Sequence, residues 1–238
     1  MIGSAVGSAD AAPAVDRDIS STSGSSGAVG PVQNGAMTET VIPGESRGTA
    51  RARVEQAALN LFTRHGFDAV TSDEVADAAG ISRRTFFRYF ATKADAVWGD
   101  FDEHVRHLAR LLESADPAQP VLAAICAAYV TANEYPADQQ HLLRERMQLI
   151  LTEPALQAHA QLRYAAVDRV VAEHVTRRTG STATDLLPRL VAGTTRAAAM
   201  TAFEVWLAEP GRSLAGSLHA AFDELAAGFP SLDLRAAG

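Results

Sequence analysis

The chain has 238 residues, 47% hydrophobic and 21% charged, which is ordinary for a soluble globular protein with a sizeable core. Its single cysteine, Cys126, excludes a disulfide framework within the chain and a zinc site made of cysteines alone. The longest run of small apolar residues, 190–207, contains Arg196 and Glu204 and is not expected to cross a membrane. Because the N-terminus lacks the basic start and apolar core of a signal peptide, we predict a cytoplasmic protein.

The formal net charge of −7 is unevenly distributed along the chain. Between Thr49 and Lys93, seven basic and five acidic residues leave a charge of +2, so the remainder carries −9. A positive segment attached to an acidic body predicts a polyanionic partner for that segment alone.

Residues 1–46 are rich in glycine, serine, alanine and proline without apolar periodicity, so we predict a disordered N-terminal tail. Met37 lies shortly before the ordered part, and one hypothesis is that translation starts there. From about Thr49 the pattern is helical, and no segment alternates as a strand would. The sequence therefore predicts an all-α protein of about nine helices, followed by a flexible C-terminus at 231–238.

The first predicted helix has a single apolar face and a defined end. The residues at the spacing of that face are Val54, Ala57, Ala58, Leu61 and Phe62. Gly66 follows and is expected to close the helix.

Two short helices are predicted next. Thr71 and Glu74 have the spacing of a capping box, and Gly80 follows the short helix that it begins. Ser82 can cap a second helix, "RRTFFRYF". Two short capped helices joined by a glycine turn are typical of a helix-turn-helix motif, whose second helix enters the major groove of DNA.

A longer helix is expected from about Thr92. Its apolar stripe comprises Val97, Phe101, Val105, Leu108 and Leu112. The segment "VLAAICAAYVTANE" is apolar nearly all round and is expected to be buried, with Cys126 as a small core residue. The segment "QQHLLRERMQLIL" is a further predicted helix.

The last three predicted helices have recognisable ends. Pro154 opens a long helix that closes at "RRTG", where Gly180 is the expected stop. Asp185 can cap the helix that runs through Leu207, and Ser213 can cap the final one. The stripe of the final helix comprises Leu214, Leu218, Phe222 and Leu225.

On a helical wheel, the second helix of the motif has an aromatic side and a polar side. Phe86 and Phe90, with Phe87 at the edge, anchor the helix, whereas the polar side faces outward and comprises Arg84, Thr85, Arg88 and Tyr89. Arginine can bind the guanine edge or a phosphate, so Arg84 and Arg88 are candidates for base reading and Arg83 for bases or backbone. The candidates for phosphate positioning are Thr71, Ser72, Ser82, Tyr89 and Lys93. The alternative, a solvated arginine face, fits the caps and local charge less well.

The stretch "ALNLFTRHGFDAVTSDEVADAAGISRRTFFRYFATKADAV" resembles the DNA-binding domain of the TetR family of bacterial transcriptional regulators. The resemblance covers about residues 49–96. It implies an all-α homodimer with a helix-turn-helix domain at 47–93 and a ligand-binding and dimerisation domain at 94–230. It also implies a double-stranded DNA operator that is released when a small-molecule effector binds. Phe87 replaces the tyrosine usual at its place, so the phosphate-binding hydroxyl often found there is absent.

The segments "KADAVWGDFDEHV", "HLLRERMQLILTEPALQAHAQLRYAAVDRVVAEHV" and "FEVWL" are similar to regulators associated with mycofactocin gene clusters. This second resemblance implies a repressor of redox genes whose effector is an acyl-CoA-type thioester. A different regulon with another effector is the alternative.

Seven residues of the C-terminal domain are candidates for effector binding: Phe101, Tyr129, Arg144, Met147, Arg163, Glu204 and Trp206. Arg144 and Arg163, with Arg146, lie beside apolar positions where they could meet phosphates, although surface salt bridges are the commoner role of such arginines. Aromatic residues at helical spacing are likewise more often plain core. Glu204 could pair with a ligand or with Arg196, or lie exposed.

His104 and His107, one turn after Asp100 and Glu103, could bind a metal ion. We expect no metal and no cofactor, since no further ligand stands out at matching spacing.

The small residues of "VAGTTRAAAMTA" and "LAGSLHAAF" let helices approach closely and predict a four-helix dimer interface. We find no hydrolase, metalloprotease or phosphate-loop motif, so an enzyme is not expected. A protein that coats DNA without specificity is the remote alternative, but it would need a broadly basic surface, and the acidic remainder argues against this.

Overall fold

The computed structural model describes residues 47–136 and 139–229. Within these ranges the chain forms ten α-helices and no strand, so the all-α prediction is confirmed. The tail at 1–46 with its proposed start at Met37, and the C-terminus at 231–238, lie outside the described residues. The first four helices are α1 (Arg47–His65), α2 (Ser72–Ala78), α3 (Arg83–Tyr89) and α4 (Lys93–Trp98). The other six are α5 (Phe101–Glu113), α6 (Val121–Ala132), α7 (Gln140–Thr152), α8 (Pro154–Thr179), α9 (Leu186–Ala208) and α10 (Leu214–Ala227).

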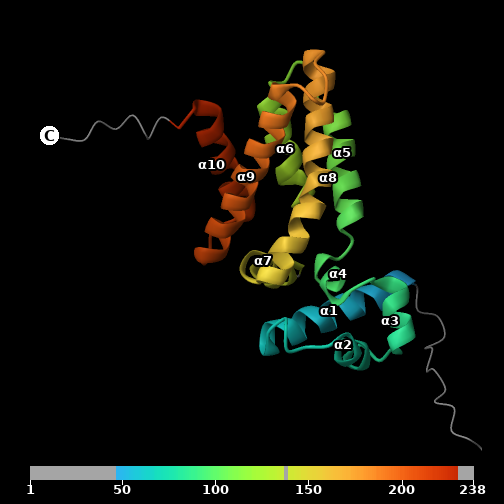
Figure 1. Cartoon of the computed structure of the whole chain (residues 1–238). Helices are drawn as coiled ribbons and strands as arrows, with labels where there is room; N and C mark the ends of the chain where they lie inside the picture. Colours follow the sequence, from blue (N-terminus) through green and yellow to red (C-terminus); the bar gives the residue numbers. More distant parts are fainter. Residues whose placement is uncertain (1–46, 137–138, 230–238) are drawn as a thin grey trace, which may run out of the picture. The chain divides into compact units, whose positions relative to one another are not determined.

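The predicted apolar face of α1 forms the centre of the N-terminal helices. Val54, Ala58 and Phe62 are buried, and the helix packs against α2, α4 and α7. Figure 1 shows α1, α2 and α3 beside one another, with α4 next in the chain. Because α1 contacts both α2 and α7, it connects the helix-turn-helix to the rest of the described fold.

The two short helices begin with the caps that the sequence predicts. The Oγ1 atom of Thr71 accepts from the Glu74 amide at 3.2 Å, and the Glu74 carboxylate accepts from the Thr71 amide at 2.7 Å. Gly80 makes the turn between α2 and α3 with φ +67°, a conformation that favours glycine. Ser82 then caps α3, its Oγ accepting from the Thr85 amide at 3.2 Å.

The single helix predicted from about Thr92 is in fact two helices, α4 and α5, which raises the number within the described residues to ten. Gly99 separates them with φ +61° and ψ −145°, a conformation accessible essentially only to glycine. Asp100 then caps α5 by accepting from the Glu103 amide at 3.3 Å. The apolar stripe continues across this break, with Val97 and Leu108 both buried, so its periodicity gave no sign of the break.

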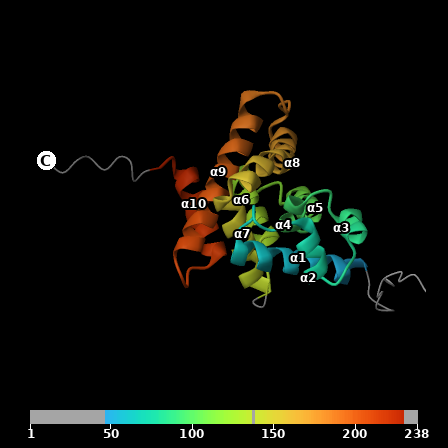
Figure 2. The same cartoon turned by 60° about the horizontal axis from the view of Figure 1, so that its bottom comes forward.

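The C-terminal helices pack around two central helices, α8 and α9. In Figure 1, α8 runs between α5 and α9, in agreement with its contacts to both. Figure 2 shows α9 and α10 side by side, and α10 also packs against α6. Small residues at 192, 199, 202 and 217 are buried on α9 and α10, as the close approach of these helices requires.

The cap predicted at Asp185 differs from the one observed. Asp185 occupies the N-cap position of α9, but its side chain makes no hydrogen bond to that helix. Its carboxylate instead accepts from the Thr182 amide at 2.8 Å and lies in the preceding turn. The local turn therefore competes successfully for the same acceptor.

Among the described residues, none of the helices has both the length and the apolarity needed to span a membrane.

Candidate DNA-binding surface and ligand cavity

The recognition helix α3 is anchored by two buried aromatic rings. Phe86 and Phe90 are both almost fully buried, with ring centroids 5.5 Å apart. Phe87 packs edge-on against Phe86 at 5.3 Å, yet it is 42% exposed, so this ring contributes to the anchor only in part. The aromatic side chains thus fix a helix of only seven residues against α2.

The polar face of α3 presents cations to solvent. Arg84 and Arg88 are exposed, and within the part of the chain that the structure describes neither forms an ion pair. Arg88 lies over the Tyr89 ring at 5.3 Å. Arg83 is also exposed, but it donates to the Asp73 carboxylate at 2.6 Å. Arg84 and Arg88 are therefore the cations that are most available to a polyanion.

Thr85 lies on a different face from the one predicted. It is 6% exposed, and its Oγ1 accepts from the Ser82 hydroxyl at 3.0 Å. The hydrogen bond to the N-cap residue Ser82 holds this side chain against the start of α3, a contact that the helical wheel does not describe. Thr85 therefore stabilises the start of α3 and does not face outward.

Lys93 has an internal role that the sequence analysis missed. Its Nζ donates to the carbonyl oxygens of Phe67 at 2.7 Å and Val70 at 2.8 Å, and lies 4.4 Å from the centre of the Phe67 ring. Lys93 thus fastens the loop between α1 and α2 to the start of α4. An ammonium with two carbonyl acceptors is a poor candidate for free phosphate contact.

The other predicted phosphate-binding residues lie near helix starts or ends. Thr71 is exposed but engaged with Glu74, and Ser72 is the half-buried first residue of α2. Ser82 is exposed at the start of α3, whereas Tyr89 is half-buried at its end.

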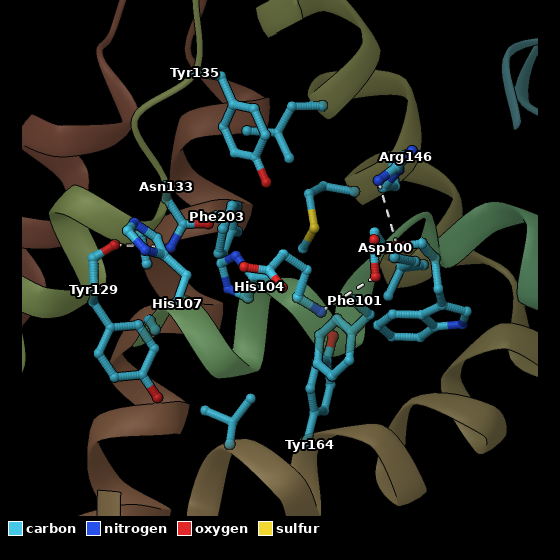
Figure 3. A pocket seen from close by; sticks show the side chains of 18 of the residues that line it. Asp100, Phe101, His104, His107, Tyr129, Asn133, Tyr135, Arg146, Tyr164 and Phe203 are labelled. Carbon is cyan, nitrogen blue, oxygen red and sulfur yellow. Dashed lines mark hydrogen bonds between the residues drawn. The ribbon is translucent and has the colours of Figure 1, made fainter. Parts of the chain in front are cut away.

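A cavity of about 450 Å³ lies among α5, α6, α7, α8 and α9. Figure 3 shows Phe101, Tyr129 and Tyr164 along its wall, with Tyr135 and Phe203. Phe101 and Tyr129 are among the predicted effector-binding residues, and Met147, a third, also lines the cavity. The volume is within the range usual for small-molecule sites.

The other four predicted residues do not line this cavity. The Arg144 guanidinium stacks on the Trp206 ring at 4.2 Å, so these two residues form a cation–π pair with each other. Arg163 pairs with Asp95 of α4 at 2.6 Å, and Glu204 is exposed. Their helical positions are as predicted, but none of the four side chains lines this cavity.

One side of the cavity carries polar groups from α5 and from the loop after α6. His104 and His107 face it from α5, and Asn133 faces it from the loop (Figure 3). Burial lowers the pKa of His104 below its ordinary value of 6.5, and the nearby His107 lowers it further. His104 is therefore neutral at pH 7 and can accept or donate one hydrogen bond.

Two hydroxyls of the wall make no hydrogen bond of normal geometry with the described residues, although one of them, that of Tyr129, lies near enough to Thr195 for the threonine to act on its pKa. They belong to Tyr129 and Tyr164, and both are buried. Burial raises the pKa of Tyr164 to about 12 and also raises that of Tyr129, so both are neutral phenols. A bound molecule with polar atoms could satisfy them.

Two of the arginines that line the cavity are already paired. Arg110 donates to Glu103 at 2.7 Å, and Arg196 donates to both carboxylate oxygens of Asp168 at 2.9 and 3.1 Å. Arg196 therefore does not pair with Glu204, which was one of the alternatives. The third arginine, Arg146, makes only longer contacts, the nearest being Glu55 at 3.3 Å.

Within the described ranges, no group of three or more histidine, cysteine, aspartate or glutamate side chains could hold a metal ion. Cys126 is buried, and its sulfur lies 3.6 Å from His219 Nδ1. Burial raises the pKa of the Cys126 thiol, which agrees with its predicted role as a small core residue.

Comparisons with known proteins agree with this arrangement. Residues 56–96 match the model of the bacterial regulatory proteins of the tetR family, and residues 119–230 match that of the MftR C-terminal domain. Over 190 residues the chain is 40% identical to MftR of Mycobacterium tuberculosis (strain ATCC 25618 / H37Rv), provisionally assigned as a mycofactocin biosynthesis transcriptional regulator. That alignment covers 80% of this chain and 96% of the relative.

Two solved structures share the fold. The fatty acid degradation regulator FadR of Bacillus halodurans has a TM-score of 0.57 at 16% identity, covering 78% of this chain and 99% of that one. The complex of SmeT of Stenotrophomonas maltophilia with triclosan also has a TM-score of 0.57 at 16% identity, covering 75% and 90%. At such identities the likeness shows the fold alone.

An anchored helix-turn-helix joined to a helical domain with a cavity defines a DNA-binding transcription regulator with a ligand-binding domain. The chain belongs to the TetR family of bacterial transcriptional regulators and is homologous to MftR. Regulators of this family bind operator DNA as dimers and respond to small-molecule effectors.

Proposed function

We propose that this regulator is a repressor that leaves its operator when a small, largely apolar effector occupies the cavity. The observation that carries the proposal is the pair of exposed arginines on α3 that form no ion pair with any described residue, in the same chain as a cavity of about 450 Å³. Arg84 and Arg88 would read bases in the major groove, where arginine binds the guanine edge with two hydrogen bonds. Its partner being chromosomal DNA, the protein would act in the cytoplasm.

The proposed contacts to the DNA backbone come from the starts of the two short helices and from the end of the second. Thr71, Ser72 and Ser82 lie where backbone amides and hydroxyls meet phosphates in such motifs. Tyr89 and Arg83 would contribute from α3, with Arg83 exchanging Asp73 for a phosphate. These contacts set the position of the helix on the duplex without choosing the sequence.

The proposed division of the chain follows the predicted boundaries. Residues 47–93 would bind DNA, and residues 94–230 would bind the effector and form the dimer. The surfaces of α9 and α10 would build the interface as a four-helix bundle. We expect light scattering at micromolar concentration to give the mass of a dimer, and a monomer would contradict this part.

The effector that we propose is an acyl-CoA-type thioester, and the regulated genes are redox genes linked to mycofactocin. The 40% identity to MftR supports the regulon. A cavity of this volume suits an acyl chain, and the larger nucleotide of the thioester would have to lie at the opening. No catalytic activity is part of the proposal.

A thermal-shift screen with acyl-CoAs of increasing chain length tests the effector. Footprinting of the promoter beside the gene of this protein then tests the operator. Competition with random DNA at fixed salt should show a preference of about 10³-fold or more for the footprinted site. Equal binding to both DNAs would contradict regulation by a specific operator.

A further inference from the structure

Arg146 contacts both the cavity and the DNA-binding part of the molecule. It lies on α7 and lines the cavity, as Figure 3 shows. Its Nη2 atom donates to the carboxylate of Glu55 at 3.3 Å, and Glu55 lies on α1. Because α1 packs against α2, and α2 against the recognition helix, one guanidinium connects the cavity to the DNA-binding motif.

The hydrogen-bonding capacity of Arg146 is mostly unused. A guanidinium has five N–H donors, but among the described residues Arg146 makes only two contacts, both long, to Glu55 and, at 3.4 Å, to the carbonyl oxygen of Trp98. Its Nε is buried and has no partner among the described residues. Its side chain is only 18% exposed, so water can satisfy few of these donors. An anion that approaches more closely than Glu55 would be favoured here.

If Arg146 left Glu55 to bind an anion, the Glu55 carboxylate would still have a second partner. Arg51, one turn before Glu55 on α1, donates to its Oε1 at 3.0 Å. Glu55 would therefore remain paired after losing Arg146, which avoids the large cost of leaving a buried charge without a counterion. In contrast, taking Arg196 from Asp168 would remove the cation that binds both oxygens of that carboxylate.

The same guanidinium touches the junction between α4 and α5. A Cβ atom placed on Gly99 would lie 2.3 Å from Nη1 of Arg146, so the arginine lies directly against this glycine. Arg51 also donates to the carbonyl oxygen of Gly99 at 2.9 Å. A movement of Arg146 toward the cavity would thus change the contacts of α1, of α7 and of the junction together.

We propose that Arg146 is the anion-binding residue of the cavity, and that an amphipathic anion bound there replaces Glu55 as its partner. The head group would be a carboxylate or a phosphate, and the apolar body would lie against Tyr164, Met200 and Phe203. The exchange breaks the ion pair between α7 and α1. Anion binding by Arg146 does not depend on the proposed function. Only the link between this binding and release from DNA rests on it.

The first test compares probes with the same apolar chain and different head groups. The chain has two tryptophans, and Trp206→Phe leaves Trp98, which lines the cavity, as the single fluorescent reporter. Decanoate, decyl phosphate and decanol are titrated below their aggregation limits. At least one of the anions should bind about tenfold or more tightly than decanol, as expected for hydrogen bonds to a charged group. Equal affinities, or no binding of either anion, overturn the proposal.

The second test removes the arginine. In the same single-tryptophan background, Arg146→Gln should reduce the preference for the anion over decanol to about twofold or less. Arg110→Gln is the matched control, because Arg110 also lines the cavity but is paired with Glu103. If Arg110→Gln removes the preference and Arg146→Gln does not, the proposal is wrong.

The third test removes the competing carboxylate and does not depend on the stability of Arg146→Gln. Glu55→Gln should bind the anion about three- to tenfold more tightly, because Arg146 no longer has to leave a charged partner. A gain in affinity cannot arise from loss of the fold. An unchanged affinity would show that anion binding and the Glu55 contact are independent, and would overturn the exchange.

The link to DNA is measured separately, by anisotropy with the labelled promoter fragment. The anion that binds more tightly should weaken DNA binding of the wild-type chain at least tenfold and that of Arg146→Gln less than twofold. Equal weakening of both overturns the link. If the wild-type chain does not bind the DNA fragment but still binds the anion more tightly than decanol, the proposed function is wrong and the assignment of Arg146 stands.

Discussion

The arginines of the recognition helix and those of the cavity differ in what already binds them. Arg84 and Arg88 on α3 are exposed and have no ion-pair partner among the described residues, so the proposed contact with DNA would not have to displace a carboxylate. Around the cavity, Arg110 and Arg196 are held by carboxylates at 2.7–3.1 Å. A ligand that binds one of these arginines in the cavity must displace the carboxylate that already pairs with it. Its affinity is therefore a difference between two interactions, and this difference can be coupled to a change elsewhere.

The two regions also differ in how they are held. The DNA-binding helices are short and depend on caps and on two buried rings, all within about twenty residues of sequence. The cavity is formed by five helices whose contributing residues lie up to about a hundred residues apart. Between the two regions, α1 and α4 pack against α7, and substitutions at Gly99 and Lys93, at the end and the start of α4, should have the largest effects on stability.

Gly99→Ala is expected to have the largest effect on stability. Alanine is strained at φ +61° and ψ −145°, so the free energy of unfolding should fall by about 3 kcal/mol, and the Arg146 guanidinium would also have to move away from the added Cβ. Gly180→Ala is the matched control, since Gly180 also has positive φ but nothing within 4 Å of the added atom. It should cost about 1–2 kcal/mol in the same urea titration. Equal losses would mean that the contact with Arg146 is unimportant.

Lys93→Met should lower the free energy of unfolding by about 1.5–3 kcal/mol, because the ammonium donates to two loop carbonyls. Lys93 is the only lysine in the chain, and Arg84→Met removes an exposed cation as control. The control should change stability by less than about 0.5 kcal/mol. If Lys93→Met has unchanged stability but binds all DNA sequences more weakly, Lys93 contacts the DNA phosphates, as the sequence predicted.

Arg84→Ala should weaken operator binding by about 1–3 kcal/mol and relax the choice of one base pair, because one bidentate base contact is lost. The measurement is affinity for the footprinted operator and its single-base variants at fixed salt. Arg83→Ala, whose arginine is engaged by Asp73, should weaken binding less and without a change in sequence preference. A uniform loss for Arg84→Ala would assign that residue to the DNA backbone.

The smallest predicted effect is a dependence of stability on pH that comes from His104. Burial and the nearby His107 place the pKa of His104 below 6.5 in the folded chain. As the pH falls below 6.5, the unfolded chain binds a proton that the folded chain does not, so stability decreases until the folded pKa is reached. His174, whose pKa burial also lowers, contributes with the same sign. Melting curves between pH 7.5 and about 5 should show a shallower decline for His104→Gln than for the wild type.

The sequence determined the local structure of the DNA-binding part because its signals act over three or four residues. The capping box at Thr71, the cap at Ser82 and the anchor rings Phe86 and Phe90 were all predicted and are all present. Such signals need only the neighbouring backbone. Most of the local structure of this motif is therefore encoded within the motif itself.

Only the tertiary structure decided which charged side chains are free. Lys93 meets carbonyls more than twenty residues away, Arg163 reaches Asp95, and Arg144 stacks on Trp206. A helical pattern gives the face on which a side chain starts, but a long side chain can reach partners on another helix. The break at Gly99 was hidden for a similar reason, because the apolar stripe continues through it and only the contacts of the folded chain require the turn.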